Sequence, residues 1–366
     1  MEYELMLKQI VMIIVGLLLI YLAIKKQYEP SLLLPMGFGS ILVNLPNSAV
    51  ISSNDTNGII QWLFEVGIEV SEAMPILLFI GIGAMIDFGP LLENPKLFLL
   101  GIGGQFGIIA SMALANFMGF SLKDSACIGI IGAADGPTAI MVSQVLDSNY
   151  IGSIAVSAYS YMAIVPVILP LAIKLTTTKK ERQMVMKYNN KSVSNRKRIL
   201  FPVTTTIIAG ILVPSSLPLV GFLMFGNLIK ECGVLKTLTQ TAQETLTNLI
   251  TLLLGITISF SMKAEQFVTV ETLMIMAIGL FAFFIDAIGG IMIAKLMNVF
   301  CKKKINPIVG AAGISAFPMA ARTVQSVGAK ENSMNVLLNH GLGANVAGQM
   351  ASAIAGGMII RFISMK

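Results

Sequence analysis

The sequence of 366 residues is 55% hydrophobic and only 12% charged, with a formal net charge of +6. An ordinary soluble domain is about 25% charged, so this composition excludes a cytosolic enzyme, a disordered chain and a secreted disulfide scaffold. It indicates an all-α polytopic membrane protein. The single histidine argues against a histidine-ligated metal site, and most of the positive charge lies in one loop, so we expect no nucleic-acid partner.

The N-terminal region, residues 1–73, is expected to contribute one retained span and an amphipathic segment. Residues 10–24 are apolar and end at Lys25 and Lys26. Acidic residues precede this run and no cleavage site follows it, which argues against a signal peptide. Residues 61–72 place three glutamates opposite aromatic and aliphatic side chains, a pattern typical of a helix at the membrane interface.

A strongly basic loop, residues 176–198, divides the rest of the chain. Nine lysines and arginines stand against one acid, Glu181, between Lys174 and Arg198, so the positive-inside rule predicts a cytoplasmic loop. The alternative is a docking surface for an acidic partner. Including the N-terminal apolar stretches, we expect about ten or eleven spans. The later ones are expected at 74–92, 97–118, 126–146, 150–175, 199–213, 217–230, 245–262, 271–296 and 335–362.

A weak internal repeat relates residues 74–175 to residues 199–366. The first copy contains LLFIGIGAMIDF and then GAADGPTAI, and the second contains LLLGITISFSM and then GAAGISAFPMA. Both copies end in segments rich in Gly, Ala and Pro, near 132–140 and 306–322, which cannot form continuous helices. Broken segments in matching positions of two repeats are a strong sequence pointer to a transport site. We therefore expect two inverted repeats with a transport site at the broken segments.

Asp135 is the strongest single candidate. It lies in the first broken segment with no other charge within ten residues on either side, and a charge at the bilayer centre costs about 2.5–3.5 kcal/mol. It can cap the half-helix that begins near Gly136 and Pro137. It can also bind a cation, because a carboxylate beside freed backbone carbonyls offers the oxygen ligands that hard cations prefer. A proton carrier is a further alternative.

Other polar residues in apolar stretches are secondary candidates. Tyr159 and Tyr161 lie in the span after Asp135, and a buried phenol needs a partner, although packing explains them equally. Asp286 can bind a cation, relay a proton or pair with a lysine. For Asn345, helix packing is the favoured interpretation.

The second broken segment, NPIVGAAGISAFPMAAR, offers Asn306, Ser315 and Arg322 among glycines. The planar arginine side chain suits a carboxylate, whereas an arginine near the end of a span can also extend to lipid headgroups. The sequence GIGGQFG lies within a span without a preceding strand, which favours helix packing over dinucleotide binding. The chain also has no Walker A sequence.

Four motifs together resemble one known family. They are GAADGPTAI, AYSYMAIVPVILP, DAIGGIMIAKLMN and NPIVGAAGISAFPMAARTVQ. They are similar to the β subunit of the sodium-translocating biotin-dependent decarboxylases, which act on oxaloacetate, methylmalonyl-CoA or glutaconyl-CoA. The resemblance covers nearly the whole chain from about Pro75. It implies a fold similar to that of elevator-type carboxylate transporters.

The resemblance also implies roles for matching positions. Asp135 falls on the aspartate that is implied to bind Na⁺. The other residues implied at the Na⁺ site are Asn306 and Ser315. Those implied to bind carboxybiotin are Arg322, Asn306 and Gly310. Those implied to take part in decarboxylation and its proton transfer are Tyr161, Ser315 and Arg322.

The implied function is that of the membrane subunit of a primary Na⁺ pump in the inner membrane. Such a subunit decarboxylates carboxybiotin, consumes a proton and exports Na⁺, at a cost of about 2.3 kcal/mol per charge and 100 mV. Carboxybiotin must arrive on another subunit, because this chain has no biotin-attachment motif. The implied partners are a biotin carrier, a carboxyltransferase and a small membrane subunit, with the chain itself as a homotrimer. The alternative function is a Na⁺-coupled carboxylate symporter.

Overall fold

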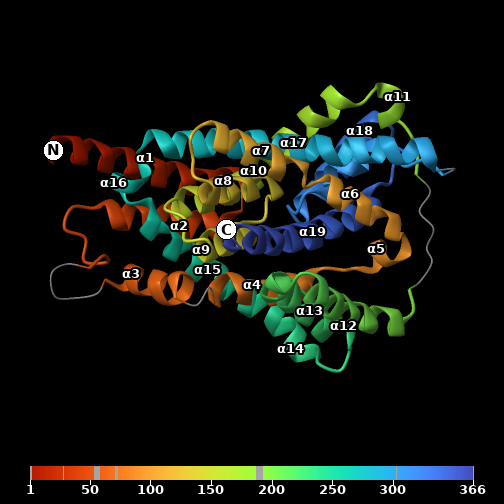
Figure 1. Ribbon diagram of the computed structural model, residues 1–366, viewed down its shortest axis with the longest axis horizontal. Helices are drawn as coiled ribbons and strands as arrows, with labels where there is room; N and C mark the ends of the chain where they lie inside the picture. Colours follow the sequence, from red (N-terminus) through yellow and green to blue (C-terminus); the bar gives the residue numbers. More distant parts are fainter. Residues whose placement is uncertain are drawn as a thin grey trace.

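The computed structural model describes residues 2–27, 29–52, 58–70, 73–186, 193–301 and 303–365. Within these ranges the chain is helical and has no β-strand, as the composition predicts (Figure 1). The α-helices are α1 (Glu2–Lys26), α2 (Pro30–Asn44), α3 (Ile59–Phe64), α4 (Ala73–Met85), α5 (Gly89–Glu93), α6 (Phe98–Gly103), α7 (Phe106–Phe117), α8 (Leu122–Gly129), α9 (Gly136–Val145), α10 (Ile151–Thr176), α11 (Lys179–Arg182), α12 (Asn195–Leu212), α13 (Leu217–Glu231), α14 (Lys236–Gln240), α15 (Thr247–Ile258), α16 (Ala264–Phe267), α17 (Val270–Phe300), α18 (Met319–Glu331) and α19 (Leu338–Ser364). The 3₁₀ segments are η2 (Pro95–Leu97), η3 (Ile130–Ala133), η4 (Pro214–Ser216), η6 (Ser259–Met262) and η7 (Pro307–Gly313), and the π segments are η1 (Glu65–Glu69) and η5 (Thr241–Leu246).

Among the described residues, five helical stretches are long and apolar enough to cross a membrane, and up to seven if two bent pairs each count as one span. The five are Tyr3–Lys26, Pro95–Phe117, Lys236–Met262, Val270–Phe300 and Leu338–Ser364. The bent pairs are Ile59–Glu69 with Ala73–Met85, and Ile151–Met162 with Ile164–Thr176. The protein is therefore a multi-pass membrane protein. Fewer stretches than the expected ten or eleven meet this criterion, because several apolar runs are divided into short helices.

The segment expected to be amphipathic forms α3 and η1. Phe64 and Ile68 are buried, whereas Trp62 and Val66 are exposed. The two helical pieces therefore present one face to the protein and the other outward, and Glu72 lies outside the described residues.

Two hydrophobic clusters organise the packing. The larger cluster extends from α4 to α10 and includes α12, α13 and α17 to α19, while the smaller one gathers α1, α2, α3, α15 and α16. Helices α9 and α10 contribute to both clusters. Ile140, Ala155, Val156 and Tyr159 belong to the smaller cluster, although their helices are mostly packed in the larger one. The residues that follow Asp135 therefore lie at the boundary between the two clusters.

Helix α17 supports both broken segments near its middle. A Cβ atom added at Gly290 would lie 2.0 Å from the carbonyl oxygen of Gly310 in η7, so only glycine allows this approach. One turn earlier, the side chain of Asp286 lies against Gly132 of η3. The two breaks are thus packed against neighbouring turns of one long helix.

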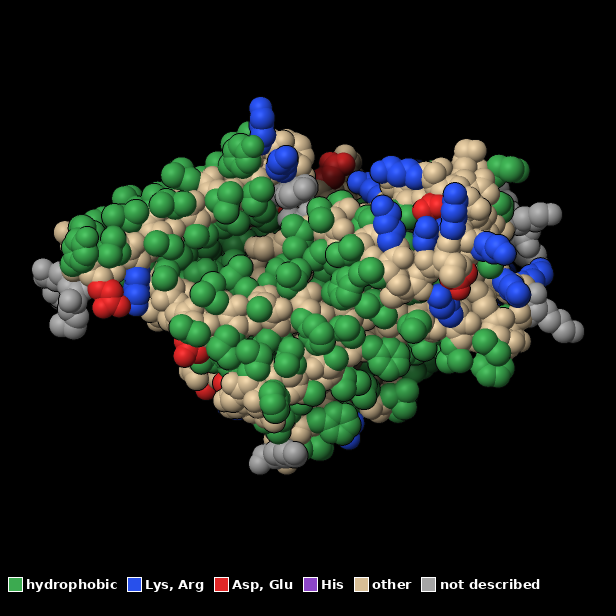
Figure 2. Space-filling model, turned by 90° about the horizontal axis from the view of Figure 1, so that it is seen from above, with side chains coloured by type: hydrophobic (Ala, Val, Ile, Leu, Met, Phe, Trp, Pro, Cys, Tyr) green, Lys and Arg blue, Asp and Glu red, His purple; other side chains and the backbone are tan. Residues whose placement is uncertain are grey.

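The two ends of the molecule differ in charge. Figure 2 shows lysines and arginines gathered over the right-hand end of the molecule, where Figure 1 places α11, α18 and the last turns of α17. At this end Lys295 forms a 3.0 Å ion pair with Glu181. The positive-inside rule predicts that this is the cytoplasmic end. Lys187 and Lys191 of the basic loop lie outside the described residues.

Candidate functional site

The backbone changes conformation several times around Asp135. Helix α8 continues into η3, Ala134 then adopts a left-handed conformation with φ of 54°, and α9 begins directly after Asp135. Asp135 is therefore the N-cap residue of α9, and Pro137 lies in the first turn, where its missing N–H removes no helical hydrogen bond. The side chain is only 3% exposed. The local break thus places a carboxylate in the protein interior.

Three uncharged side chains donate hydrogen bonds to one oxygen of Asp135. The distances to Oδ2 are 2.6 Å from Thr138 Oγ1, 2.8 Å from Ser352 Oγ and 2.9 Å from Gln349 Nε2. No residue that the structure describes forms an ion pair with Asp135. A buried carboxylate held only by neutral donors has no compensating charge. The surroundings therefore suit a bound cation or a proton.

Two of these donors come from α19 and are absent from the sequence-based candidates. Asn345, Gln349 and Ser352 are spaced i, i+4 and i+7, so they share one face of the helix. Asn345 donates a 2.6 Å hydrogen bond to the carbonyl of Ile314, and its Oδ1 is buried without a hydrogen-bond partner in the described structure. A polar stripe along a helix rich in glycine and alanine is the signal that could have identified Gln349 and Ser352.

The two broken segments meet at Ser315. Its backbone N–H donates to the carbonyl of Ala133 at 3.0 Å, and its hydroxyl donates to the carbonyl of Gly348 at 3.0 Å. Ala133 is two residues before Asp135, and Gly348 immediately precedes Gln349. Ser315 therefore links both breaks and α19 in the immediate surroundings of the carboxylate.

Close backbone contacts hold these segments together. A Cβ atom at Gly348 or at Gly104 would lie 2.2 or 2.3 Å from the carbonyl oxygen of Gly313. Gly104 lies where α6 ends and α7 begins, so a further helix break packs against η7. The glycines of GIGGQFG thus serve close packing, which was the favoured sequence interpretation.

The two tyrosines of α10 point to different neighbours. The Tyr161 hydroxyl donates to the carbonyl of Met276 in α17, and its ring lies against Gly279 of the same helix. The Tyr159 ring lies against Gly136, where an added Cβ would meet its Cζ at 2.2 Å. The Tyr159 hydroxyl is buried without a hydrogen-bond partner in the described part of the chain. Tyr159, a secondary candidate, is thus the tyrosine next to the Asp135 segment.

Asp286 occupies a separate buried position on α17. Its Oδ1 accepts a hydrogen bond from the backbone N–H of Gly107, in the first turn of α7. A carboxylate is favourable at this position because a helix N-terminus carries partial positive charge. Oδ2 lies near Gly132 and has no hydrogen-bond partner among the described residues. Asp286 therefore binds the N-terminus of α7 with one oxygen and packs against η3 with the other.

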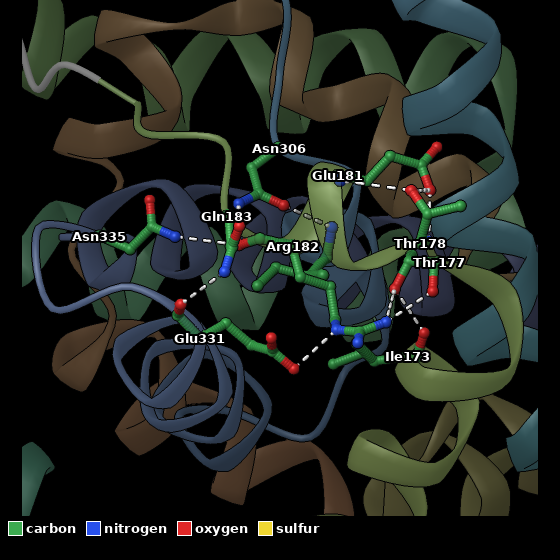
Figure 3. A network of polar contacts seen from close by, with 10 residues as sticks. Ile173, Thr177, Thr178, Glu181, Arg182, Gln183, Asn306, Glu331 and Asn335 are labelled. Atoms are coloured by element: carbon green, nitrogen blue, oxygen red, sulfur yellow. Dashed lines mark hydrogen bonds and ion pairs between the residues drawn. The ribbon is translucent and has the colours of Figure 1, made fainter.

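Asn306 is directed toward the basic linker, which is the described part of the basic loop 176–198 (Figure 3). Its Nδ2 donates to the carbonyls of Arg182 at 3.1 Å and Met184 at 2.8 Å, while its Oδ1 accepts from the N–H of Ile308 at 3.2 Å. Asn335 also donates to the Arg182 carbonyl, at 3.0 Å. The amide nitrogen of Asn306 therefore attaches the start of η7 to the basic linker, while its oxygen caps η7. Its implied role as a Na⁺ ligand stays a prediction.

Arg182 and Glu181 complete this attachment. Arg182 forms a 2.8 Å ion pair with Glu331 of α18 and donates to the Thr177 carbonyl at 2.6 Å. Partial burial raises the pKa of Glu181, but hydrogen bonds from the Thr178 backbone and from Lys295 outweigh this effect and lower the pKa below its usual value. The ion pair between Arg182 and Glu331 thus attaches the linker that follows α10 to α18, as Figure 3 shows.

Arg322 and Gly310 have different surroundings. Arg322 is exposed on α18, the helix that follows the second break. Gly310 is buried in η7 against Gly290, as described above. Arg322 is therefore open to a molecule from outside the chain, whereas Gly310 provides close backbone packing.

The chain is similar to a set of named proteins over almost its full length. The family described as Na⁺-transporting oxaloacetate decarboxylase beta subunit matches residues 8–363. The methylmalonyl-CoA decarboxylase subunit beta of Veillonella parvula is 45% identical, over 97% of this chain and 93% of the relative. The glutaconyl-CoA decarboxylase subunit beta of Acidaminococcus fermentans is 43% identical over 97% and 93%. The probable oxaloacetate decarboxylase beta chain of Vibrio cholerae is 40% identical over 96% and 95%.

Proposed function

The chain belongs to the family of Na⁺-transporting oxaloacetate decarboxylase β subunits, and from this premise we propose that Asp135 and the two broken segments form its Na⁺ site. The protein is the multi-pass membrane subunit of a decarboxylation-driven Na⁺ pump, and its family assigns it to the inner membrane. The relatives named above are all decarboxylase subunits, so the symporter alternative is not favoured.

One observation carries the Na⁺ site: Asp135 is buried, and its partners are all uncharged. Na⁺ would neutralise the carboxylate, and the hydroxyl oxygens of Thr138 and Ser352 can turn from donors to the carboxylate into ligands of the ion. The Oδ1 of Asn345, buried and free of hydrogen bonds in the described structure, supplies another oxygen nearby. Ser315 would align the two breaks around the ion.

Carboxybiotin would be the substrate that a separate carrier subunit delivers to the cytoplasmic end. Its carboxylate needs a cationic partner, and the exposed guanidinium of Arg322 can supply a bidentate one. Decarboxylation consumes a proton, which a hydroxyl such as that of Ser315 or Tyr161 would deliver. Asn306 and Gly310 would act by holding η7 in place.

The remaining partners follow from the kind of complex that this family forms. We expect a biotin carrier, a carboxyltransferase and a small membrane subunit, with this chain as a homotrimer. Helix α1 leaves surface for further contacts in the membrane, because only 22% of its most apolar stretch of 18 residues is buried within the chain. Lipid or a second copy of the chain would cover the rest.

The central test replaces Asp135 by Asn in the intact complex. Asn keeps the size of the side chain but removes the charge, so we expect ²²Na⁺ transport and Na⁺-dependent release of CO₂ from carboxybiotin to be abolished. Asp147→Asn is the matched control, because Asp147 is an exposed residue at the other end of α9 and Asn tolerates its positive φ of 51°. Full Na⁺ transport by the Asp135 variant would remove this residue from the site.

A second measurement separates the pump from the symporter. The purified chain, reconstituted with a carboxybiotinylated carrier, should release CO₂ in a Na⁺-dependent manner. Accumulation of a labelled carboxylate in the vesicles, with no release of CO₂, would instead identify a symporter.

A further inference from the structure

A cavity of about 410 Å³ opens at the end of the protein opposite the basic linker. Its wall is formed by the connection from α9 to α10, by η6 and α16, by the start of α17, and by Phe64. Polar side chains contribute much of this wall, and Glu271 is the one charged residue among those that line it in the described structure. Asn149, Ser153, Gln266 and Thr269 are among these polar side chains.

Helix α17 shows on which side of the membrane the cavity lies. It has 31 residues and is therefore about 46 Å long, more than the thickness of the hydrocarbon core. Glu271 lies in its first turn, whereas Lys295, near its other end, pairs with Glu181 of the basic linker. Because the positive-inside rule makes the linker cytoplasmic, the cavity lies at the outer end.

One face of α10 leads from the cavity toward Asp135. Gly152 lines the cavity, and Ala155, Val156 and Tyr159 follow it at i+3, i+4 and i+7, so all four share one face. Ala155, Val156 and Tyr159 are buried in the smaller hydrophobic cluster. From Gly152 to Tyr159 this face covers two turns, or about 10 Å.

Tyr159 closes the inner end of this face. Its ring lies against Gly136, the neighbour of Asp135, and its buried hydroxyl has no hydrogen-bond partner among the described residues. An unpaired hydroxyl in the interior is costly, and the lone pairs of its oxygen are open to coordinate a passing cation. Along this face, the buried side chains of Ala155 and Val156 separate the cavity wall from this tyrosine.

We propose that the cavity is the outer vestibule of the Na⁺ pathway, in which Glu271 attracts a hydrated alkali cation and Tyr159 separates the vestibule from Asp135. The proposal rests on the Na⁺ site proposed above and adds the route by which the ion leaves it. A carboxylate in a partly enclosed cavity raises the local concentration of cations. The polar wall offers oxygen atoms to the water shell of the ion.

The first experiment measures inhibition by Na⁺ at the outer face. The complex is reconstituted so that this face lines the vesicle lumen, and lumenal Na⁺ is varied while CO₂ release is followed. In Glu271→Gln we expect the half-inhibitory concentration to rise about two- to fivefold, the effect of one partly exposed charge. Glu265→Gln is the control, because Glu265 is exposed on the neighbouring α16 but does not line the cavity. Equal inhibition curves for Glu271→Gln and the wild type would overturn the proposal.

The second experiment blocks the cavity. Asn149→Cys is labelled with a bulky cationic thiol reagent before reconstitution, and ²²Na⁺ transport is then measured. We expect transport to be lost in this variant but retained in Asn116→Cys, an exposed position at the end of α7 that does not line the cavity. The unsubstituted chain controls for its three native cysteines.

The two experiments separate this proposal from the Na⁺ site itself. If labelled Asn149→Cys transports normally while Asp135→Asn does not, the vestibule is wrong and the Na⁺ site stands. If Asp135→Asn transports normally, the Na⁺ site fails, whatever the cavity variants do.

Discussion

Asp135 combines two properties that usually exclude each other. Asp135 is the N-cap residue of α9, and the partial positive charge of a helix N-terminus favours a carboxylate at this position. Its Oδ2 is nevertheless surrounded only by neutral donors. The described residues thus supply no permanent counter-charge to this carboxylate. This is the condition that a reversible cation site requires.

Ser352→Ala tests whether the donors from α19 belong to the Na⁺ site. Hydrogen bonds to charged groups are each worth about 1.5–3 kcal/mol, so we expect the Na⁺ concentration for half-maximal CO₂ release to rise about tenfold or more. Ser40→Ala is the control, since Ser40 of α2 is equally buried but donates to the carbonyl of Met12 in α1. An unchanged Na⁺ dependence in Ser352→Ala would limit Ser352 to a packing role.

Asp135 and its partners differ in how far the sequence could reveal them. Asp135 stands out because an isolated charge in an apolar run is costly. Gln349 and Ser352 lie more than 200 residues later in the chain and carry no charge, so only their helical spacing distinguishes them from packing residues. For Asn306 the family motif implies a role at the Na⁺ site, and this role stays a prediction. Motif letters do not give the direction of a side chain, and the structure shows the amide nitrogen bound to carbonyls of the linker.

The breaks in η3, in η7 and between α6 and α7 work as one packed unit. Each is accommodated by glycine: Gly132 against Asp286, Gly310 against Gly290, and Gly104 against Gly313. Backbone groups released from regular helices must find partners within the membrane, and the bond from Ser315 N–H to the Ala133 carbonyl is one example. The irregular segments therefore depend on one another.

Gly348→Ala tests this dependence. The new Cβ would lie 2.2 Å from the Gly313 carbonyl oxygen, and overpacking of this kind costs about 1–3 kcal/mol. We expect a lower unfolding temperature and weaker Na⁺ activation together. Gly221→Ala is the matched control, because its Cβ would meet only a Thr206 methyl group, at 3.9 Å. Equal unfolding temperatures in the two variants would contradict the close packing of α19 on η7.

Apolar patterns predicted which stretches are helical better than where they break. The glycine and proline of GAADGPTAI indicated the interruption before α9, since both act through the backbone alone. The bend within α10 and the division into α6 and α7 were not predicted. The bend within α10 lies within one turn before Pro166, which interrupts the helical hydrogen bonds locally. The division into α6 and α7 instead depends on a packing partner distant in sequence, Gly313 for Gly104.

Composition alone was sufficient for the class of the molecule. A chain with 55% hydrophobic and 12% charged residues cannot cover itself with a water-soluble surface, and the all-α membrane architecture follows. The division into a larger and a smaller hydrophobic cluster could not be predicted from the sequence. It depends on side chains such as Ile140 and Tyr159, which pack in the smaller cluster while other residues of their helices pack in the larger one. That boundary passes beside the predicted Na⁺ site.

Na⁺ should stabilise the whole fold if it binds at this boundary. A ligand at 100 times its dissociation constant contributes about 2.7 kcal/mol to the free energy of unfolding. We therefore expect the unfolding temperature of the purified protein to rise with NaCl more than with choline chloride at equal ionic strength. The difference should disappear in Asp135→Asn. A Na⁺-specific rise that persists in this variant would indicate an ion bound elsewhere.

The hydrogen bonds that reach Asp135 from α19 have a consequence for how such a chain can be divided. One donor, Thr138, is local, and the other two are encoded near the opposite terminus. A gene split at the basic linker would therefore yield two polypeptides, neither of which contains both Asp135 and all three of its donors. Co-expression should restore sodium export only where the fragments assemble, so that complementation itself becomes a measure of assembly.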